Sequence, residues 1–284
     1  QHFSENAQRI IAMQEDYINC IDAAVLFLQG RNPSMAHLIA SRNFLPEAGR
    51  FKELPDLHWS FGTMGVQDKA KHIATLFLED LSDLIQECVD EHFGFSRYAE
   101  RLGRCANQFD ELYEALQQTL SYTDELLLQL LEQHISHVQP KLVCVSVPFP
   151  GNLFAAFRVA QWIRKNRPDI KVAMGGGFPN TELRSLKDPR VFEFFDFITL
   201  DDGEAPVEQL VKYITGEAEV QELKRTFLLQ NGVVTYINNS SCRDYKQTET
   251  GTPDYGDLLL DRYISAIEVV NPMHSLWSDG RWNK

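Results

Sequence analysis

The sequence lacks the long apolar runs of a membrane protein and the positive charge of a nucleic-acid-binding protein. Its longest apolar runs, such as residues 23–28, fall far short of the ~20 residues that cross a bilayer. Among the 284 residues, 27 Lys and Arg stand against 40 Asp and Glu, a formal net charge of −13. This excess of acid repels a phosphate backbone, so neither a membrane nor a nucleic acid is an expected partner.

Cysteine is sparse, and no two cysteines have the spacing of a metal site. The five are scattered along the chain, with no CxxC or CxxxC among Cys20, Cys88, Cys105, Cys144 and Cys242. Zinc and iron–sulfur sites are therefore not expected, and no metal ligand is assigned. Cys88, on an apolar helical stripe, and Cys144, in an apolar strand, are expected to be buried, inert thiols. The start of the sequence has no basic segment followed by an apolar one, so no secretory signal is expected. Together with the scattered cysteines, this favours a cytoplasmic protein.

No convincing strand pattern precedes Pro140, which predicts a helical subdomain over residues 1–139. Apolar residues at helical spacing predict helices over residues 10–28, 33–41, 73–89 and 107–138. Residues 43–63 contain Pro, Gly and aromatic residues and are expected to form a loop.

Strands and helices alternate after Pro140. Apolar runs predict strands over residues 142–147, 171–174 and 197–200, and helical patterns follow each of them. This alternation favours an α/β fold with a flavodoxin-like or Rossmann-like parallel sheet over residues 140–217. The first strand is expected to be buried on both faces. Gly216 is the expected end of the last helix.

Residues 218–284 are expected to form a hairpin and a linker. Asn231-Gly232 between two apolar runs is a strong signal for a two-residue hairpin turn. A doubly wound sheet has about five strands, and the pattern gives three plus this hairpin. Either the hairpin adds edge strands, or another strand precedes Gln1.

The ends of the three predicted strands are the candidate site. Ser146-Val147-Pro148 ends the first strand, Gly175-Gly176-Gly177 the second, and Asp201-Asp202-Gly203-Glu204 follows the third. Carboxyl ends of parallel strands meet at one edge, where glycines let a flat ligand approach the backbone. The plainer alternatives are that the glycines serve tight turns and that the acids cap the next helix.

These segments resemble a known family. Gly175-Gly176-Gly177-Phe178-Pro179, then Phe195-Asp196-Phe197-Ile198, then Asp202-Gly203-Glu204 are similar to the N-terminal module of cobalamin-dependent-type radical SAM proteins. That family has a Gly-Glu-Gly-Glu turn, whose first two positions are Asp201 and Asp202 here. Pro253 to Ile264 is similar to the linker before the family's catalytic barrel. The resemblance covers Leu142 to Ile264.

The resemblance implies a cobalamin-binding-like domain with a large helical insert, cut from a radical SAM iron–sulfur oxidoreductase. The implied cofactor-binding residues are Ser146, Val147, Pro148, Gly175, Gly176, Gly177, Asp202, Gly203 and Glu204. The 4Fe–4S cluster and SAM belong to the barrel, whose CxxxCxxC motif is absent here and is expected beyond Lys284. The partner is then the chain's own radical SAM domain, the small-molecule substrate is unknown, and no catalytic residue is expected in this chain.

Two other functions stay open. The module could have lost cobalamin and serve as a structural or substrate-recognising cap, or it could be a stand-alone small-molecule-binding or signalling domain. His92, in Asp90-Glu91-His92-Phe93-Gly94, departs from the DxHxxG spacing of a cobalt-ligating loop. His134 and His137 are three residues apart and are expected to be solvated or core histidines rather than a metal pair.

Overall fold

The computed structural model describes residues 3–52, 54, 61, 65–95, 98–104 and 109–264. It shows a mixed α/β protein with two compact units: a helical unit from residues 1–91 and 254–284, and a sheet unit from residues 92–253. This division differs from the predicted boundary at residue 139, because the helices between residues 100 and 138 pack with the sheet. Among the described residues, no helix is both long and apolar enough to cross a bilayer.

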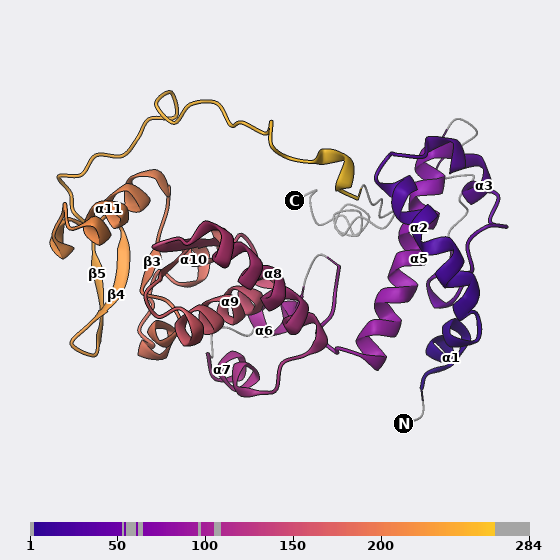
Figure 1. Ribbon diagram of the computed structural model, residues 1–284, viewed down its shortest axis with the longest axis horizontal. Helices are drawn as coiled ribbons and strands as arrows, with labels where there is room; N and C mark the ends of the chain where they lie inside the picture. The colour runs from indigo at the N-terminus through magenta and orange to yellow at the C-terminus, as the bar shows by residue number, and fades with distance from the viewer. Residues whose placement is uncertain are drawn as a thin grey trace, which may run out of the picture. The chain divides into compact units, whose positions relative to one another are not determined.

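The helical unit is organised around one long helix. Its elements are α1 (Glu5–Ala12), α2 (Gln14–Leu28), η1 (Pro33–Met35), α3 (Ala36–Ala40), η2 (Gly49–Phe51), α5 (Val66–Cys88) and η6 (Leu260–Arg262). The predicted helix over residues 10–28 is therefore two helices that meet at Met13 (Figure 1). Ile73 and Phe77 of α5 are fully buried, and Phe77 stacks on Tyr17 with ring centroids 5.0 Å apart. The predicted loop over residues 43–63 lies partly outside the described residues.

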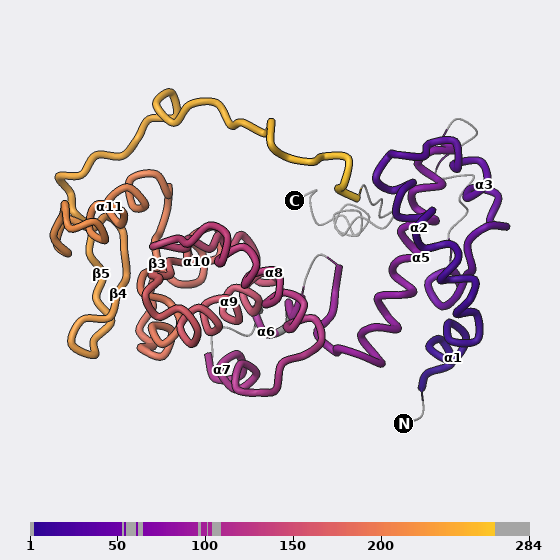
Figure 2. Tube along the Cα trace, viewed as in Figure 1, coloured from indigo at the N-terminus to yellow at the C-terminus, as the bar shows by residue number. Residues whose placement is uncertain are grey.

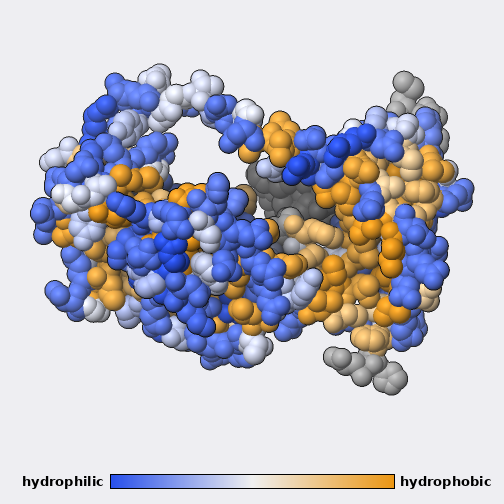
Figure 3. Space-filling view, viewed as in Figure 1, coloured by the Kyte–Doolittle hydropathy of each residue, from blue (hydrophilic) through white to orange (hydrophobic). Residues whose placement is uncertain are grey.

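Apolar side chains also reach the surface of the helical unit. Ile11, Ile18, Leu26 and Leu38 are exposed, Ile18 to 69%. Figure 3 shows apolar residues beside charged ones along the visible helices of this unit. The helix α2 therefore carries apolar residues on its exposed side as well as on the side that faces the core.

A buried carboxylate joins α5 to η2. Asp80 is fully buried, and its oxygens accept hydrogen bonds from the backbone N–H groups of Ala48 and Arg50, both at 2.9 Å. Burial is the main cause that raises the pKa of Asp80, opposed by these two hydrogen bonds. The side chain therefore satisfies backbone donors in a place where a charge is costly.

We expect the stability of the helical unit to depend on pH through Asp80. An acid with a raised folded pKa favours folding fully below its unfolded pKa, and this contribution is lost as the pH rises through the folded pKa. Wild type should therefore lose stability relative to Asp80→Asn, which does not titrate, as the pH rises from about 4, the ordinary pKa of an aspartate, toward neutrality. Urea unfolding across that range measures the difference. A difference that grows toward acid pH in favour of Asp80→Asn would contradict this account.

The sheet unit places five strands between helices. Its helices are α6 (Glu100–Arg104), α7 (Phe109–Gln117), α8 (Tyr122–Val138), η3 (Pro150–Asn152), α9 (Leu153–Asn166), α10 (Gly177–Glu182), η4 (Pro189–Glu193), α11 (Glu204–Thr215) and η5 (Val220–Glu222). Its strands are β1 (Leu142–Ser146), β2 (Lys171–Gly175), β3 (Phe197–Thr199), β4 (Thr226–Gln230) and β5 (Val233–Ile237). The strand order is β1-β2-β3-β4-β5.

The sheet is mixed rather than parallel throughout, which corrects the prediction. β1, β2 and β3 are parallel neighbours, whereas β4 pairs antiparallel with β3, and β5 pairs antiparallel with β4. The hairpin thus adds the last two strands. Its turn has Asn231 at φ 51° and Gly232 at φ 79°, which is the conformation that Asn-Gly favours. Gly216 ends α11 at φ 80°, as predicted.

Two apolar clusters cover the two faces of the sheet. One contains Phe154 and Phe157 of α9 and Met174 of β2, and the other contains Leu210 of α11 and Phe197 of β3. The chain passes from β1 through α9 into β2, a path that Figure 2 traces. The core therefore lies between α9 and α11, and it fixes where β1, β2 and β3 end.

β1 is not buried on both faces, contrary to the prediction. It is the first strand in the sheet order, and Cys144 and Ser146, which share one face, are exposed. Cys88 is also exposed, so the prediction of buried thiols is wrong at both residues. The apolar sequence of β1 does not reveal that the sheet ends beside it. Cys105 lies outside the described residues.

A buried ion pair fastens α8 to α9. Arg158 donates from Nε to Asp124 at 2.9 Å, and both side chains are almost fully buried. The same guanidinium donates to the carbonyl oxygens of Leu116 at 2.7 Å and Ala115 at 3.2 Å. Tyr98 donates to the other carboxylate oxygen of Asp124 at 3.2 Å. One arginine therefore holds α7, α8 and α9 together.

Candidate functional site

The three predicted segments lie at neighbouring strand ends. Ser146 pairs with Gly175 across β1 and β2, and Met174 pairs with Ile198 across β2 and β3. Since these strands are parallel, their carboxyl ends share one edge of the sheet. We call this edge, formed by residues 146–149, 175–178 and 201–204, the strand-end edge.

Protein atoms already occupy the space above the glycines. A Cβ on Gly176 would lie 2.8 Å from the backbone N and O of Val147, and one on Gly177 would lie 2.7 Å from the carbonyl oxygen of Pro148. Val147 donates its N–H to Gly175 at 2.8 Å, and Phe178 donates to Val147 at 2.9 Å. Gly176 also has φ +103°. Because these glycines have no side chain, the loop after β2 packs directly against the loop after β1.

The segment after β1 presents both polar and aromatic groups to solvent. Ser146 and Pro148 are exposed, whereas Val147 is fully buried and contributes its backbone. Phe149 is 70% exposed and precedes Pro150, the start of η3. Sequence reasoning missed Phe149, although an aromatic residue between two prolines at a strand end is a usable signal. An exposed ring here offers an apolar surface beside Ser146.

The acidic turn after β3 is held in an unusual backbone conformation. Asp201 has φ 61°, and its N–H donates to Oδ1 of Asn180 at 2.5 Å. Arg184 donates to the carboxylate of Asp201. Left-handed backbone at a non-glycine residue is uncommon and needs such support. Asp201 therefore contacts the segment that follows β2, which joins two parts of the strand-end edge, and its carboxylate also lies 3.9 Å from Nε of Arg225.

Arg225 supports the same turn from β4. This residue lies just before Thr226 and is largely buried. Its guanidinium donates to the carbonyl oxygens of Leu200 at 3.2 Å and Asp202 at 2.9 Å, and to the carboxylate of Asp244 at 2.5 Å. The pairing with Arg225 lowers the pKa of Asp244. No local pattern in the sequence marks Arg225 as part of this turn, because it follows the turn by more than twenty residues.

The acids of this turn do not cap α11. The helix begins after Gly203, and no side chain hydrogen-bonds to its first N–H groups at that cap. Asp202 and Glu204 are exposed, and a Cβ on Gly203 would meet nothing within 4 Å. The alternative interpretation of these acids as hydrogen-bonding caps is therefore wrong, although Glu204 lies in the first turn of α11, where a carboxylate complements the helix dipole. The turn instead presents two carboxylates and an open backbone position to solvent.

The histidines singled out from the sequence lie away from this edge. His92 lies in a turn after α5, its ring 6.1 Å from that of Phe154, and not in a loop between a strand and a helix. His134 and His137 are both exposed on α8. Within the described part of the chain, no group of three His, Cys, Asp or Glu side chains is arranged to hold a metal ion.

Comparison of the chain with known proteins found no matching family model, no matching curated protein and no matching solved structure. The candidate site is therefore defined by its geometry alone.

Proposed function

We propose that this chain is the cobalamin-binding-type module of a radical SAM iron–sulfur oxidoreductase, working in the cytoplasm. It would present the cofactor, or cap the substrate, over a catalytic barrel that holds the 4Fe–4S cluster and SAM. The observation that carries the proposal is the meeting of residues 146–148, 175–177 and 202–204 at one edge of parallel strands. In parallel α/β sheets, ligands bind outside the carboxyl ends of the strands.

A finer classification as flavodoxin-like or Rossmann-like belongs to the same proposal. In such sheets the ligand crevice forms where the strand order reverses. The order β1-β2-β3 runs without reversal, and β1 keeps an unpaired edge among the described strands. The proposal therefore requires a further parallel strand beside β1, which would put the reversal next to Ser146 and Phe149.

The residues fit cobalamin at some positions of the strand-end edge. Ser146 offers an exposed hydroxyl, Asp202 and Glu204 offer carboxylates that accept hydrogen bonds from amide groups, and Gly203 leaves the backbone open. These residues would hold the cofactor. When bound, cobalamin would supply a cobalt centre for methyl transfer or radical rearrangement in the parent enzyme. The exposed acids disfavour a ligand bound through phosphate alone.

A second function is favoured by one observation. The atoms of Val147 and Pro148 fill the space above Gly176 and Gly177, where a flat cofactor would otherwise approach the backbone. A module with this close packing would serve as a structural or substrate-recognising domain that no longer binds cobalamin. The two functions differ in whether the chain binds the cofactor.

Binding of hydroxocobalamin to the full chain distinguishes them. The proposal predicts that the cofactor co-elutes with the protein and that its visible spectrum shifts, with a dissociation constant of about 10 μM or lower, roughly −7 kcal/mol. Ser146→Phe, at the edge, should weaken binding at least about tenfold, since a bulky ring would displace the ligand. Ser241→Phe places the same ring at an exposed residue elsewhere and should have no effect. Cobalamin that passes through unbound would support the second function.

A further inference from the structure

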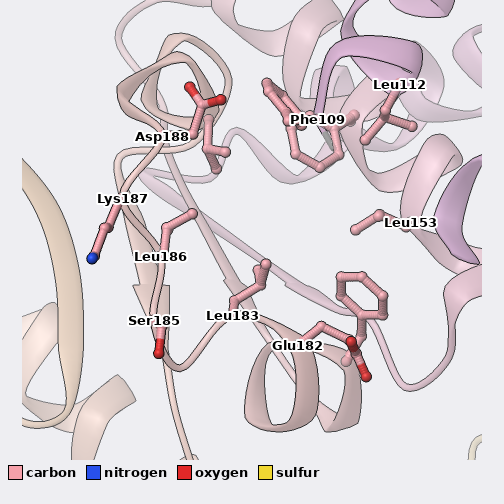
Figure 4. Close-up of a pocket in the computed structure, with 12 residues that line it drawn as sticks. Phe109, Leu112, Leu153, Glu182, Leu183, Ser185, Leu186, Lys187 and Asp188 are labelled. Atoms are coloured by element: carbon pink, nitrogen blue, oxygen red, sulfur yellow. The ribbon is translucent and has the colours of Figure 1, made fainter. Parts of the chain in front are cut away.

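A partly open, largely apolar cavity lies beside the strand-end edge. It has a volume of about 250 Å³ and lies between α7, the start of α9, α10 and the loop that follows α10 (Figure 4). Leu153 of its wall follows the turn after β1, and Phe178 follows the glycines after β2. The cavity therefore adjoins the proposed cofactor site but uses none of the nine residues assigned to it.

The interior of the cavity is apolar and aromatic. Phe109, Phe157 and Phe178 line it and are at least nine-tenths buried. Figure 4 shows Leu183 and Leu186 turned toward the space, whereas the amine of Lys187 and the hydroxyl of Ser185 point away from it. A ligand inside would therefore meet mostly apolar surface, together with the acidic side chains of Glu182 and Asp188 in the cavity lining.

Polar contacts beside the cavity fix the positions of its walls. Arg190 of η4 pairs with Asp110 of α7 at 2.8 Å and with Asp188 at 2.6 Å. The guanidinium also lies 5.4 Å from the ring centre of Phe109, and Tyr113 of α7 donates to Glu193 of η4 at 2.8 Å. These polar contacts fix α7 and η4, which carry Phe109 and Val191 of the cavity wall, relative to each other.

We infer that this cavity binds an uncharged aromatic group of one or two rings. An apolar cavity of about 150 Å³ is large enough for benzene, so 250 Å³ accommodates a bicyclic ring. Three phenylalanine rings give an aromatic ligand edge-to-face partners. Glu182 and Asp188, which also line the cavity, disfavour an anionic ligand. The inference stands independently of cobalamin binding.

Indole is a suitable probe, because it is a soluble, uncharged bicyclic ring. At ten times its dissociation constant it should raise the midpoint of thermal unfolding of the full chain by about 3–5 °C. Leu186 is half-buried at the mouth of the cavity. Its replacement by Trp should fill the cavity and abolish most of this shift. Leu229→Trp makes the same change at an exposed residue of β4 and should leave the shift intact.

Two outcomes would overturn the inference. One is the absence of any shift up to the solubility limit of indole. The other is an equal shift in Leu186→Trp and wild type, which would place the bound indole elsewhere. If Leu186→Trp does not fold, Leu183→Phe adds a smaller ring to the same space and should weaken indole binding at least fivefold. An unchanged affinity in a folded Leu183→Phe protein would count against the cavity equally.

Discussion

Arg158→Leu should lower the free energy of unfolding of the sheet unit by about 3–5 kcal/mol, the usual cost of removing one partner of a buried ion pair. The substitution leaves the buried Asp124 without its cation and removes one of the donors to the carbonyl oxygens of Leu116 and Ala115. Urea unfolding followed by circular dichroism measures the loss.

The same helix offers a matched control. Arg167, just after α9, pairs with Asp169 at a similar distance of 2.9 Å, but Asp169 is exposed. Arg167→Leu should cost about 0–1 kcal/mol, because exposed pairs contribute little. If Arg158→Leu cost no more than Arg167→Leu, the anchoring of α7 and α8 by Arg158 would be wrong. Replacing both Arg158 and Asp124 by leucine should restore part of the loss, since no buried charge then remains unpaired.

Gly176→Ala should be the second strongly destabilising change, by about 3–5 kcal/mol. Part of the cost comes from φ +103°, a region that residues with a Cβ avoid. The rest comes from placing that Cβ 2.8 Å from backbone atoms of Val147, which forces the two loops apart. Thermal and urea unfolding of the purified variant measure the effect.

Gly203→Ala is the matched control at the same edge of the sheet. Gly203 has φ −78°, and its added Cβ would meet nothing within 4 Å. The free energy of unfolding of Gly203→Ala should stay within about 0.5 kcal/mol of the wild-type value, as for most surface changes. Equal effects at Gly176 and Gly203 would mean that the loops after β1 and β2 are not packed against each other as described.

Local patterns predicted most of the elements in the second half of the chain. The apolar runs after Pro140 gave β1, β2 and β3, and Asn231-Gly232 gave the hairpin, because a two-residue turn imposes its backbone angles locally. Gly216 likewise marked the end of α11. The meeting of three strand ends also followed from local reasoning, because alternating strands and helices imply parallel neighbours.

Features set by distant residues could not be predicted in this way. The exposed face of β1 depends on where the sheet ends, which the sequence of residues 142–146 does not encode. The packing of α8 with the sheet depends on Arg158 meeting Asp124 across 34 residues. The glycines after β2 predict space in which a ligand could approach the backbone. In the structure, Val147 and Pro148 occupy that space, and the sequence does not distinguish a ligand from another loop of the protein.

The most direct test of the proposed function is hydrogen–deuterium exchange of the full chain with and without hydroxocobalamin. The account predicts slower backbone exchange over residues 146–149, 175–178 and 202–204, since a ligand at the strand-end edge would cover all three segments. Residues 233–237 of the outer strand β5 should exchange at the same rate in both conditions. Unchanged exchange in all three segments, or protection confined to other parts of the chain, would contradict the proposal.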